Sequence, residues 1–210
     1  MTPDTIRRLN QLNLDFYHIT AAQFSVTRSH PWEGWQQLIA PISAVLDRLN
    51  RPVRVLDLGC GNGRFATWLS QTWPTTYFAY HGVDGAEQLL RETQSLHLPF
   101  VHVTTHQHDI VEALLQRETF LSELTFDLVV AFGVVHHIPG DTTRQRFFEV
   151  LRKKLTKSGL AVVSIWQFDH LPQLLERQRA VSEFDLPELE AGDYLLDWQR
   201  GVSAVRYCHL

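Results

Sequence analysis

The sequence predicts an α/β fold: a mainly parallel β-sheet with helices on both faces. Strand-like and helix-like segments alternate along the chain, which is typical of such a sheet. The run VRVLDL at 53–58 is short and almost entirely apolar, and it ends in a glycine-rich turn, as expected of a central strand covered on both faces. Five strand-like segments follow one another at the spacing of crossover connections.

Length and composition indicate one globular domain. The chain has 210 residues and is 44% hydrophobic, while 20% charged and 11% aromatic residues exclude a disordered chain. Cys60 and Cys208 are too few for a disulfide scaffold, and no apolar stretch approaches the ~20 residues of a membrane span. A cytoplasmic protein with no membrane association is therefore expected. The net charge of -4 means that nucleic-acid binding would need a local basic patch or a partner.

The amino-terminal part predicts two amphipathic helices. Leu9, Leu12, Phe16 and Ile19 share one helical face, and a second apolar face recurs over residues 38–49. A loop is predicted between them at residues 24–35, because Pro31 and Gly34 there interrupt the helical pattern.

The sheet follows. The predicted strands are Val53–Leu58, Tyr77–Val83, Phe100–Thr104, Phe126–Phe132 and Leu160–Trp166. Helices are expected between most of them, most clearly at Arg64–Ser70 and Thr142–Leu155. Beyond residue 168 the pattern loosens into an acidic, leucine-bearing segment in which only Tyr194–Trp198 and Val202–Cys208 have strand character.

The turn after the first strand is the most informative feature. Gly59, Gly61 and Gly63 permit positive φ and a close approach of backbone to ligand. They lie at the carboxyl end of a central strand, which is where open α/β sheets bind ligands. A tight turn alone would need only one or two glycines. The dinucleotide pattern G-x-G-x-x-G fails, because Arg64 occupies the last glycine position and Asp57 would oppose a pyrophosphate. A ligand with an ammonium group suits the loop better. Asp84, which ends the second strand, can accept hydrogen bonds from two ribose hydroxyls, because a carboxylate has two acceptor oxygens and no donor.

These motifs, over roughly Val53–Trp166, resemble the class I S-adenosylmethionine-dependent methyltransferases, which have a Rossmann-like sheet. The resemblance implies S-adenosylmethionine as cofactor, with the methionine, ribose, adenine and sulfonium parts held in turn along the motifs. The residues so implied are Asp57, Gly59, Gly61 and Gly63, then Asp84 and Gly85, then Asp109 and Ile110, and finally Phe132 and Gly133.

The segment before the first motif is similar to that of the tRNA wobble-uridine carboxymethyl methyltransferases and their bacterial relatives. The shared pattern is carried by Tyr17, Ala21, Phe24, Ser25, Thr27, Arg28 and Trp32. Arg28 could pair with the cofactor carboxylate, and Tyr17 or Trp32 could wall the methyl group from water. The alternative is a helix that packs its aromatics on the core, with Arg28 merely exposed. The resemblance implies tRNA as acceptor, through the carboxylate of a modified uridine, and allows a small activating protein partner.

Candidate catalytic residues are His136, His137 and Tyr17. A carboxylate acceptor needs no base, whereas an amine or hydroxyl would lose a proton to one of the histidines. The histidines could instead only shape the turn after the fourth strand. No metal site is predicted, because no cysteine or carboxylate spacing completes the cluster of His102, His106 and His108.

We expect residues 1–50 to form a helical lid, 51–168 the cofactor-binding core and 169–210 an acidic substrate-side segment of a single domain. Class I sheets have seven strands and only five are predicted here, so the final helix and hairpin are expected to be missing and the fifth strand to be an exposed edge.

Two alternatives to a tRNA methyltransferase remain, a small-molecule methyltransferase and a non-catalytic cofactor-binding or partner subunit. A basic segment could contact phosphates: Arg144, Arg146, Arg152, Lys153, Lys154 and Lys157.

Overall fold

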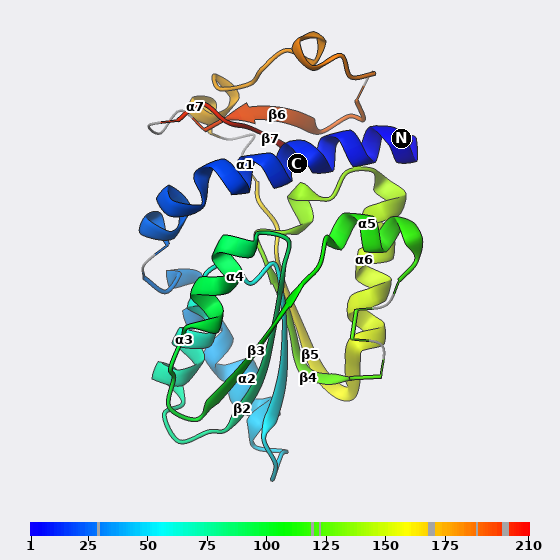
Figure 1. Cartoon of the computed structure of the whole chain (residues 1–210). Coiled ribbons are helices and arrows are strands. Elements are labelled where there is room, and N and C mark those ends of the chain that lie inside the picture. The colour runs from blue at the N-terminus through cyan, green and yellow to red at the C-terminus, as the bar shows by residue number, and fades with distance from the viewer. Residues whose placement is uncertain (29, 119, 122, 168–170, 188, 199–201) are drawn as a thin grey trace.

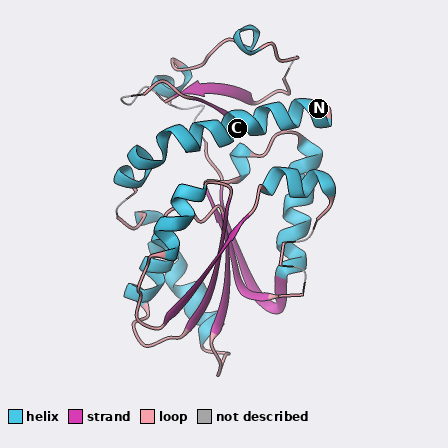
Figure 2. Ribbon diagram, in the orientation of Figure 1, coloured by secondary structure: helices cyan, strands magenta, loops and turns pink. Residues whose placement is uncertain are grey.

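A computed structural model describes residues 1–28, 30–118, 120–121, 123–167, 171–187, 189–198 and 202–210. A parallel sheet has helices on both faces, and a long helix, α1 (Pro3–Thr27), lies across one end of it (Figure 1). A small hairpin lies on the far side of α1, away from the sheet (Figure 2). The predicted domain boundary at residue 168 falls outside the described residues.

The main sheet has five parallel strands in the order β3-β2-β1-β4-β5. Their bounds are Val53–Leu58 (β1), Phe78–Asp84 (β2), Val101–Gln107 (β3), Phe126–Phe132 (β4) and Leu155–Ser164 (β5). The α/β prediction is confirmed, and β1 and β4 have the predicted bounds. The prediction for β5 was shifted: the strand starts at Leu155, directly after a helix, and reaches Leu160 through a register irregularity opposite β4. It ends before Trp166.

Helices cover the two faces of the sheet separately. One face packs against η1 (Glu33–Leu38), α2 (Ile39–Leu46), α3 (Arg64–Thr72) and α4 (Glu87–Gln94) through Trp35, Phe65, Trp68 and Leu90. The other packs against α5 (Ile110–Gln116) and α6 (Asp141–Lys154) through Val111, Leu114, Phe147 and Leu151. A short 3-10 turn, η2 (Val135–His137), follows β4. Within the described part of the chain, no helix has the length and apolarity needed to cross a membrane.

Helix α1 is longer than predicted. It starts at an N-cap, Thr2, followed by proline, and it continues through residues 24–27, which were predicted to be loop. Leu9 and Phe16 are buried, as expected of the apolar face, but Ile19 is 50% exposed, so its assignment to that face was wrong. The buried face packs mainly on the hairpin, where Leu9 lies against Leu195 and Tyr207. Ile6, near the start of the helix, instead joins the core cluster of the main sheet.

The hairpin joins β6 (Asp193–Asp197) to β7 (Val205–His209) in antiparallel register. It forms a separate two-stranded sheet, and among the described residues β5 has a strand partner only on its β4 side, the edge predicted from the sequence. Two short helical turns precede the hairpin, α7 (Pro172–Leu175) and η3 (Val181–Phe184). The hairpin therefore covers α1 and does not pair with β5.

Asn13 joins α1 to two other segments. Its side chain is buried, its Oδ1 accepts the Tyr207 N–H at 2.8 Å, and its Nδ2 donates to the His137 carbonyl at 3.1 Å. One amide thus satisfies a backbone donor of β7 and a backbone acceptor of η2, both of which would otherwise be buried without partners.

We predict that Asn13→Ala lowers the free energy of unfolding by about 1–3 kcal/mol, because it leaves those two buried backbone groups unpaired. Gln11→Ala is the matched control: Gln11 also uses its amide, to Asp15, but on the exposed side of the same helix. Denaturant unfolding would measure both variants. Equal stability of the two would contradict the bridging role.

Asp127 of β4 anchors the opposite end of the sheet. Both of its oxygens receive the Arg51 guanidinium, at 2.7 and 2.8 Å, and Oδ2 also accepts the Arg54 N–H at 3.0 Å. Burial alone would raise the pKa of Asp127, but the hydrogen bonds from Arg51 and from the Arg54 backbone hold it below its ordinary value.

A lowered pKa stabilises the folded protein above the pKa of the unfolded carboxyl, ~3.9, and this contribution is lost as the pH falls through the folded pKa. We predict that Asp127→Asn costs about 1 kcal/mol at neutral pH, since the 41% exposure of the Arg51 side chain lets solvent screen the pair. Urea unfolding at several pH values should show the difference from the unmodified chain shrinking in acid. A difference independent of pH would rule out the charged pair as its cause.

Candidate functional site

A pocket of about 800 Å³, including open space at its mouth, lies between α1 and the carboxyl ends of the strands. This size suits a nucleoside-sized ligand. Most of the residues predicted from the sequence line it: Tyr17, Gly59, Gly61, Asp84, Gly85, Asp109, Ile110, Phe132, Gly133 and His137. The others do not: Arg28, Trp32, Asp57, Gly63 and His136.

The glycine loop takes the backbone conformation that its sequence predicts. Gly59 and Gly61 have φ of 73° and 56°, in the left-handed region that side chains disfavour. A Cβ at Gly59 would collide with Val134, whereas at Gly61 it would meet only Phe24, 3.9 Å away. Gly61 therefore presents bare backbone to the pocket, opposite an aromatic ring of α1.

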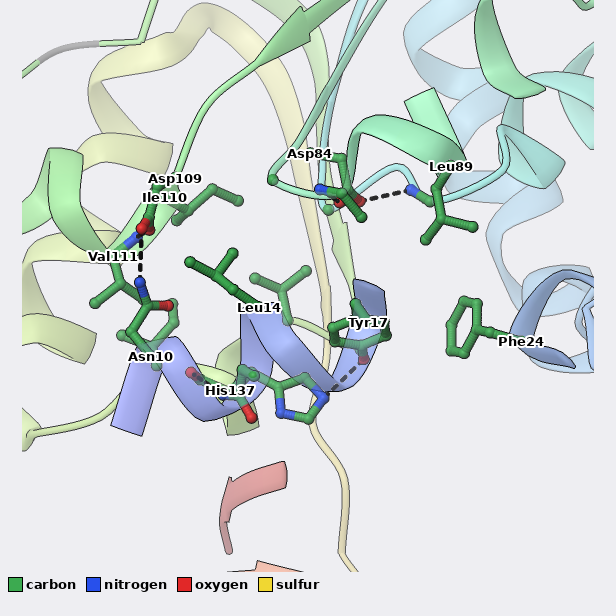
Figure 3. A pocket seen from close by; sticks show the side chains of 18 of the residues that line it. Asn10, Leu14, Tyr17, Phe24, Asp84, Leu89, Asp109, Ile110, Val111 and His137 are labelled. Carbon is green, nitrogen blue, oxygen red and sulfur yellow. Dashed lines mark hydrogen bonds between the residues drawn. The ribbon is translucent and has the colours of Figure 1, made fainter. Parts of the chain in front are cut away.

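Asp84 closes the loop from the end of β2. Its two oxygens accept the N–H groups of Gly61 and Ala86, at 2.8 and 2.9 Å, so the carboxylate is held in one orientation. Burial raises its pKa. Each oxygen keeps further lone pairs, and the carboxylate borders the pocket, where it can accept hydroxyl donors from a ligand (Figure 3).

Asp57 lies beneath the loop. It is 2% exposed, and its Oδ2 accepts the Tyr80 hydroxyl at 2.5 Å. Oδ1 is sealed, and no described residue forms a hydrogen bond with it. Burial raises the pKa of Asp57 to about 7, although the Tyr80 hydrogen bond acts in the opposite direction. An orphaned carboxylate oxygen of this kind favours a cationic group nearby.

Asp109 has a structural task at the far end of the pocket. Its Oδ1 caps α5 by accepting the N–H groups of Val111 and Glu112, and its Oδ2 accepts the Asn10 amide at 2.7 Å (Figure 3). Ile110 beside it lines the pocket with an apolar side chain. The carboxylate is thus fixed mainly by α1 and α5.

Helix α1 roofs the pocket with a second face that the sequence analysis missed. Asn10, Asn13 and Leu14 line the pocket together with Tyr17 and Phe24 (Figure 3). Their spacing of three, four and seven residues is the helical repeat, but two of them are polar, so a search for apolar periodicity does not find them. Phe24, part of the amino-terminal pattern, also borders the pocket.

Tyr17 and His137 form a hydrogen-bonded pair at the pocket wall. His137 Nδ1 lies 2.8 Å from the Tyr207 carbonyl, which can only accept, so Nδ1 carries the proton. Nε2 then accepts the Tyr17 hydroxyl at 2.9 Å. Burial lowers the pKa of His137 to about 3 and raises that of Tyr17 to about 12. Both groups are neutral near pH 7, and both ring nitrogens of His137 are in use.

His136 lies between this pair and Trp166. Its ring centroid is 4.2 Å from that of His137 and 4.9 Å from that of Trp166, and burial lowers its pKa well below the ordinary value. Its Nδ1 is sealed and has no hydrogen-bond partner among the described residues. Arg28 lies over the Phe24 ring at 4.6 Å, and Trp32 packs edge-on against Phe132. Both predicted lid residues thus contact aromatic side chains that line the pocket.

Two other predicted clusters are explained by internal contacts. His106 Nε2 on β3 lies 3.1 Å from His81 Nδ1 on the neighbouring strand β2. Among the described residues, no three side chains of the metal-binding types lie close enough together to hold an ion. The basic segment is not a uniform exposed face, because Arg144 and Lys154 are buried. Arg144 donates to the Ile138 carbonyl and to Glu190, and Lys154 donates to the Leu121 carbonyl.

Known proteins share both the sequence family and the fold. A family model for the methyltransferase domain matches residues 32–201. A candidate methyltransferase of Encephalitozoon cuniculi is 24% identical over 201 residues, covering 93% of this chain and 78% of that protein. The tRNA1(Val) (adenine(37)-N6)-methyltransferase of Vibrio cholerae is 23% identical over 160 residues, covering 76% of this chain and 61% of that enzyme.

Among solved structures, the complex of DhpI with S-adenosylhomocysteine (SAH) superposes with a TM-score of 0.57 at 18% identity, covering 97% of this chain and 81% of that one. The SAH complex of the plantazolicin methyltransferase BpumL gives 0.57 at 15% identity, with coverages of 86% and 68%. These likenesses confirm the Rossmann-like fold, and the family match confirms the predicted enzyme class. With most of its length matched by the family model, the chain belongs to the methyltransferase domain family.

Proposed function

We propose that this pocket binds S-adenosylmethionine and that the chain transfers its methyl group to an acceptor entering beside Tyr17 and His137. The observation that carries the proposal is the pairing of the bare Gly61 backbone with Asp84 on one pocket wall, opposite α1. A methyltransferase of this fold needs a cofactor site at the carboxyl ends of its strands.

The residues present fit this cofactor. Asp57 is sealed beneath the glycine loop, so it would act on an ammonium group there through its charge and not by direct contact, and the cation would favour its ionised form. Asp84 would accept two ribose hydroxyls, and Ile110 would contact the adenine ring beside Asp109. The cofactor supplies an activated methyl group on a sulfonium, and Gly133 and Phe132 would lie beneath it.

Residues 1–50 act as a lid in this proposal, residues 51–168 as the cofactor core and residues 169–210 as the acceptor side. Leu14, Tyr17 and Phe24 would cover the bound cofactor and exclude water from the methyl group. Arg28 and Trp32 would complete the lid near Phe24 and Phe132. His137 holds Tyr17 in place rather than taking a proton, because its Nε2 already accepts the Tyr17 hydroxyl.

The acceptor that we propose is a carboxylate, because both ring nitrogens of His137 are hydrogen-bonded and neither is available as a base. A carboxylate acceptor loses no proton on methylation, so it suits a wall made of neutral, fully bonded groups. The carboxylate of a modified tRNA wobble uridine, implied by the amino-terminal resemblance, is one such acceptor. The distant tRNA methyltransferase relative agrees with tRNA in general, although that enzyme is named for an adenine N6 position. A small activating protein partner belongs to the same proposal.

Two alternatives compete with this assignment. A small-molecule methyltransferase would use the same cofactor site with a different acceptor side. A non-catalytic cofactor-binding subunit would bind the cofactor and transfer nothing.

We predict that Asp84→Ala weakens S-adenosylmethionine binding at least about tenfold, because it removes a charged acceptor of two hydroxyls. Isothermal titration would measure it. Glu87→Gln is the control: it removes a charge three residues away, on an exposed side chain paired with Arg91. No binding by the unmodified chain, or equal binding by Asp84→Ala, would reject the cofactor site.

We predict that the chain transfers label from methyl-labelled S-adenosylmethionine to bulk tRNA, and that mild alkali releases the label, as expected of a methyl ester. The same assay with a metabolite extract tests the small-molecule alternative. Label confined to the small-molecule fraction would reject tRNA, and cofactor binding without transfer to either fraction would favour the non-catalytic subunit.

A further inference from the structure

The side chain of Arg206 lies in an aromatic box beside the candidate site. Its guanidinium carbon is 4.8 Å from the ring centroid of Trp166, 5.0 Å from Phe16 and 5.6 Å from Trp198. The box thus joins α1, the segment after β5 and the hairpin. Cation–π contacts of this kind hold an arginine in place without using its N–H donors.

Those donors have no acceptor among the residues that the structure describes. Arg206 is 9% exposed, and within the described part of the chain its side chain makes only the three ring contacts, with no hydrogen bond or ion pair. A buried guanidinium without an acceptor is costly, since arginines this deep are normally paired. Its nitrogens are not among the sealed polar atoms, so they remain reachable.

The box adjoins the pocket wall on the acceptor side. The charge of Arg206 contributes to the lowered pKa of His137 and opposes the raised pKa of Tyr17, so it lies within electrostatic reach of both. His136 connects the two regions: its ring is 4.9 Å from Trp166, and its Cε1 lies 3.8 Å from where a Gly133 Cβ would be.

We propose that Arg206 binds an oxyanion of the methyl acceptor, a carboxylate or a phosphate. This rests on the proposed function and names its substrate class. A guanidinium in a fixed plane matches two parallel oxygens, and a carboxylate or phosphate adds the negative charge that balances the buried cation. No carboxylate among the described residues forms an ion pair with Arg206, so the ligand would supply the negative charge that balances it.

The test uses benzoate and phenyl phosphate as probes and benzamide as their neutral counterpart, titrated into the chain with S-adenosylhomocysteine at saturation so that the cofactor pocket is filled. The variants are Arg206→Met, which keeps an apolar stem in the box, and Arg206→Lys, which keeps the charge but not the planar fork. Arg48→Met is the matched control, since Arg48 is exposed on another part of the surface. Thermal unfolding checks that each variant folds.

We expect at least one anionic probe to bind about tenfold more tightly than benzamide, a preference lost in Arg206→Met, reduced in Arg206→Lys and kept in Arg48→Met. The probe preferred tells a carboxylate from a phosphate. Equal binding of benzoate, phenyl phosphate and benzamide, or no saturable binding at millimolar concentrations, would overturn the proposal. An anion preference kept in Arg206→Met would also overturn it. If Arg206→Met fails to fold, Arg206→Lys decides in the same way, because a preference that this variant leaves unreduced does not come from Arg206.

The same titrations separate this inference from the proposed function. S-adenosylhomocysteine binding is measured first, in every variant, and Arg206→Met should leave it unchanged. Absence of that binding from the unmodified chain counts against the cofactor site, whereas its presence without anion preference counts against Arg206 alone.

Discussion

The site depends on the buried amide of Asn13. Helix α1 packs its apolar side chains on the hairpin and on one core cluster of the sheet, and a row of polar contacts fixes its position over the pocket. Asn10 donates to Asp109, Asn13 bridges His137 and Tyr207, and Tyr17 donates to His137. Each of these hydrogen bonds joins segments far apart in the chain, and each is specific in direction, so together they set both the height and the rotation of the helix.

This constraint also decides the electrostatics of the pocket. Because His137 is held by the Tyr207 carbonyl and the Tyr17 hydroxyl, it is a neutral part of the wall and not a ready base. The uncompensated charges lie on either side of it. Asp57 has an orphaned oxygen beneath the glycine loop, and Arg206 has unused donors in its aromatic box. A cationic cofactor and an anionic acceptor would therefore complete opposite ends of one site, with neutral groups between them.

The sequence predicts the sheet and the cofactor side well, because both depend on local rules. The apolar run of β1 and the three glycines after it specify a strand and a left-handed turn without reference to the rest of the chain. The roof was harder to predict, because Asn10 and Asn13 acquire their roles only through partners about a hundred residues or more away. Residues 24–27 were misassigned because Pro31 and Gly34 mark the end of the helical region but not its last turn. The start of β5 was missed because α6 passes into it at Leu155 without a turn.

Helix α1 couples the two ends of the site because adjacent residues face different neighbours. Tyr17 lines the cofactor pocket, whereas Phe16 contacts the Arg206 guanidinium and Trp198 of the hairpin side. A shift of α1 cannot move one ring without moving the other. A cofactor that moved Tyr17 and Phe24 would therefore also move the Phe16 wall of the Arg206 box. If an anion bound in the box changed the affinity for the cofactor, the cofactor would change the affinity for the anion by the same factor, whereas Arg206 without an anion has no such effect.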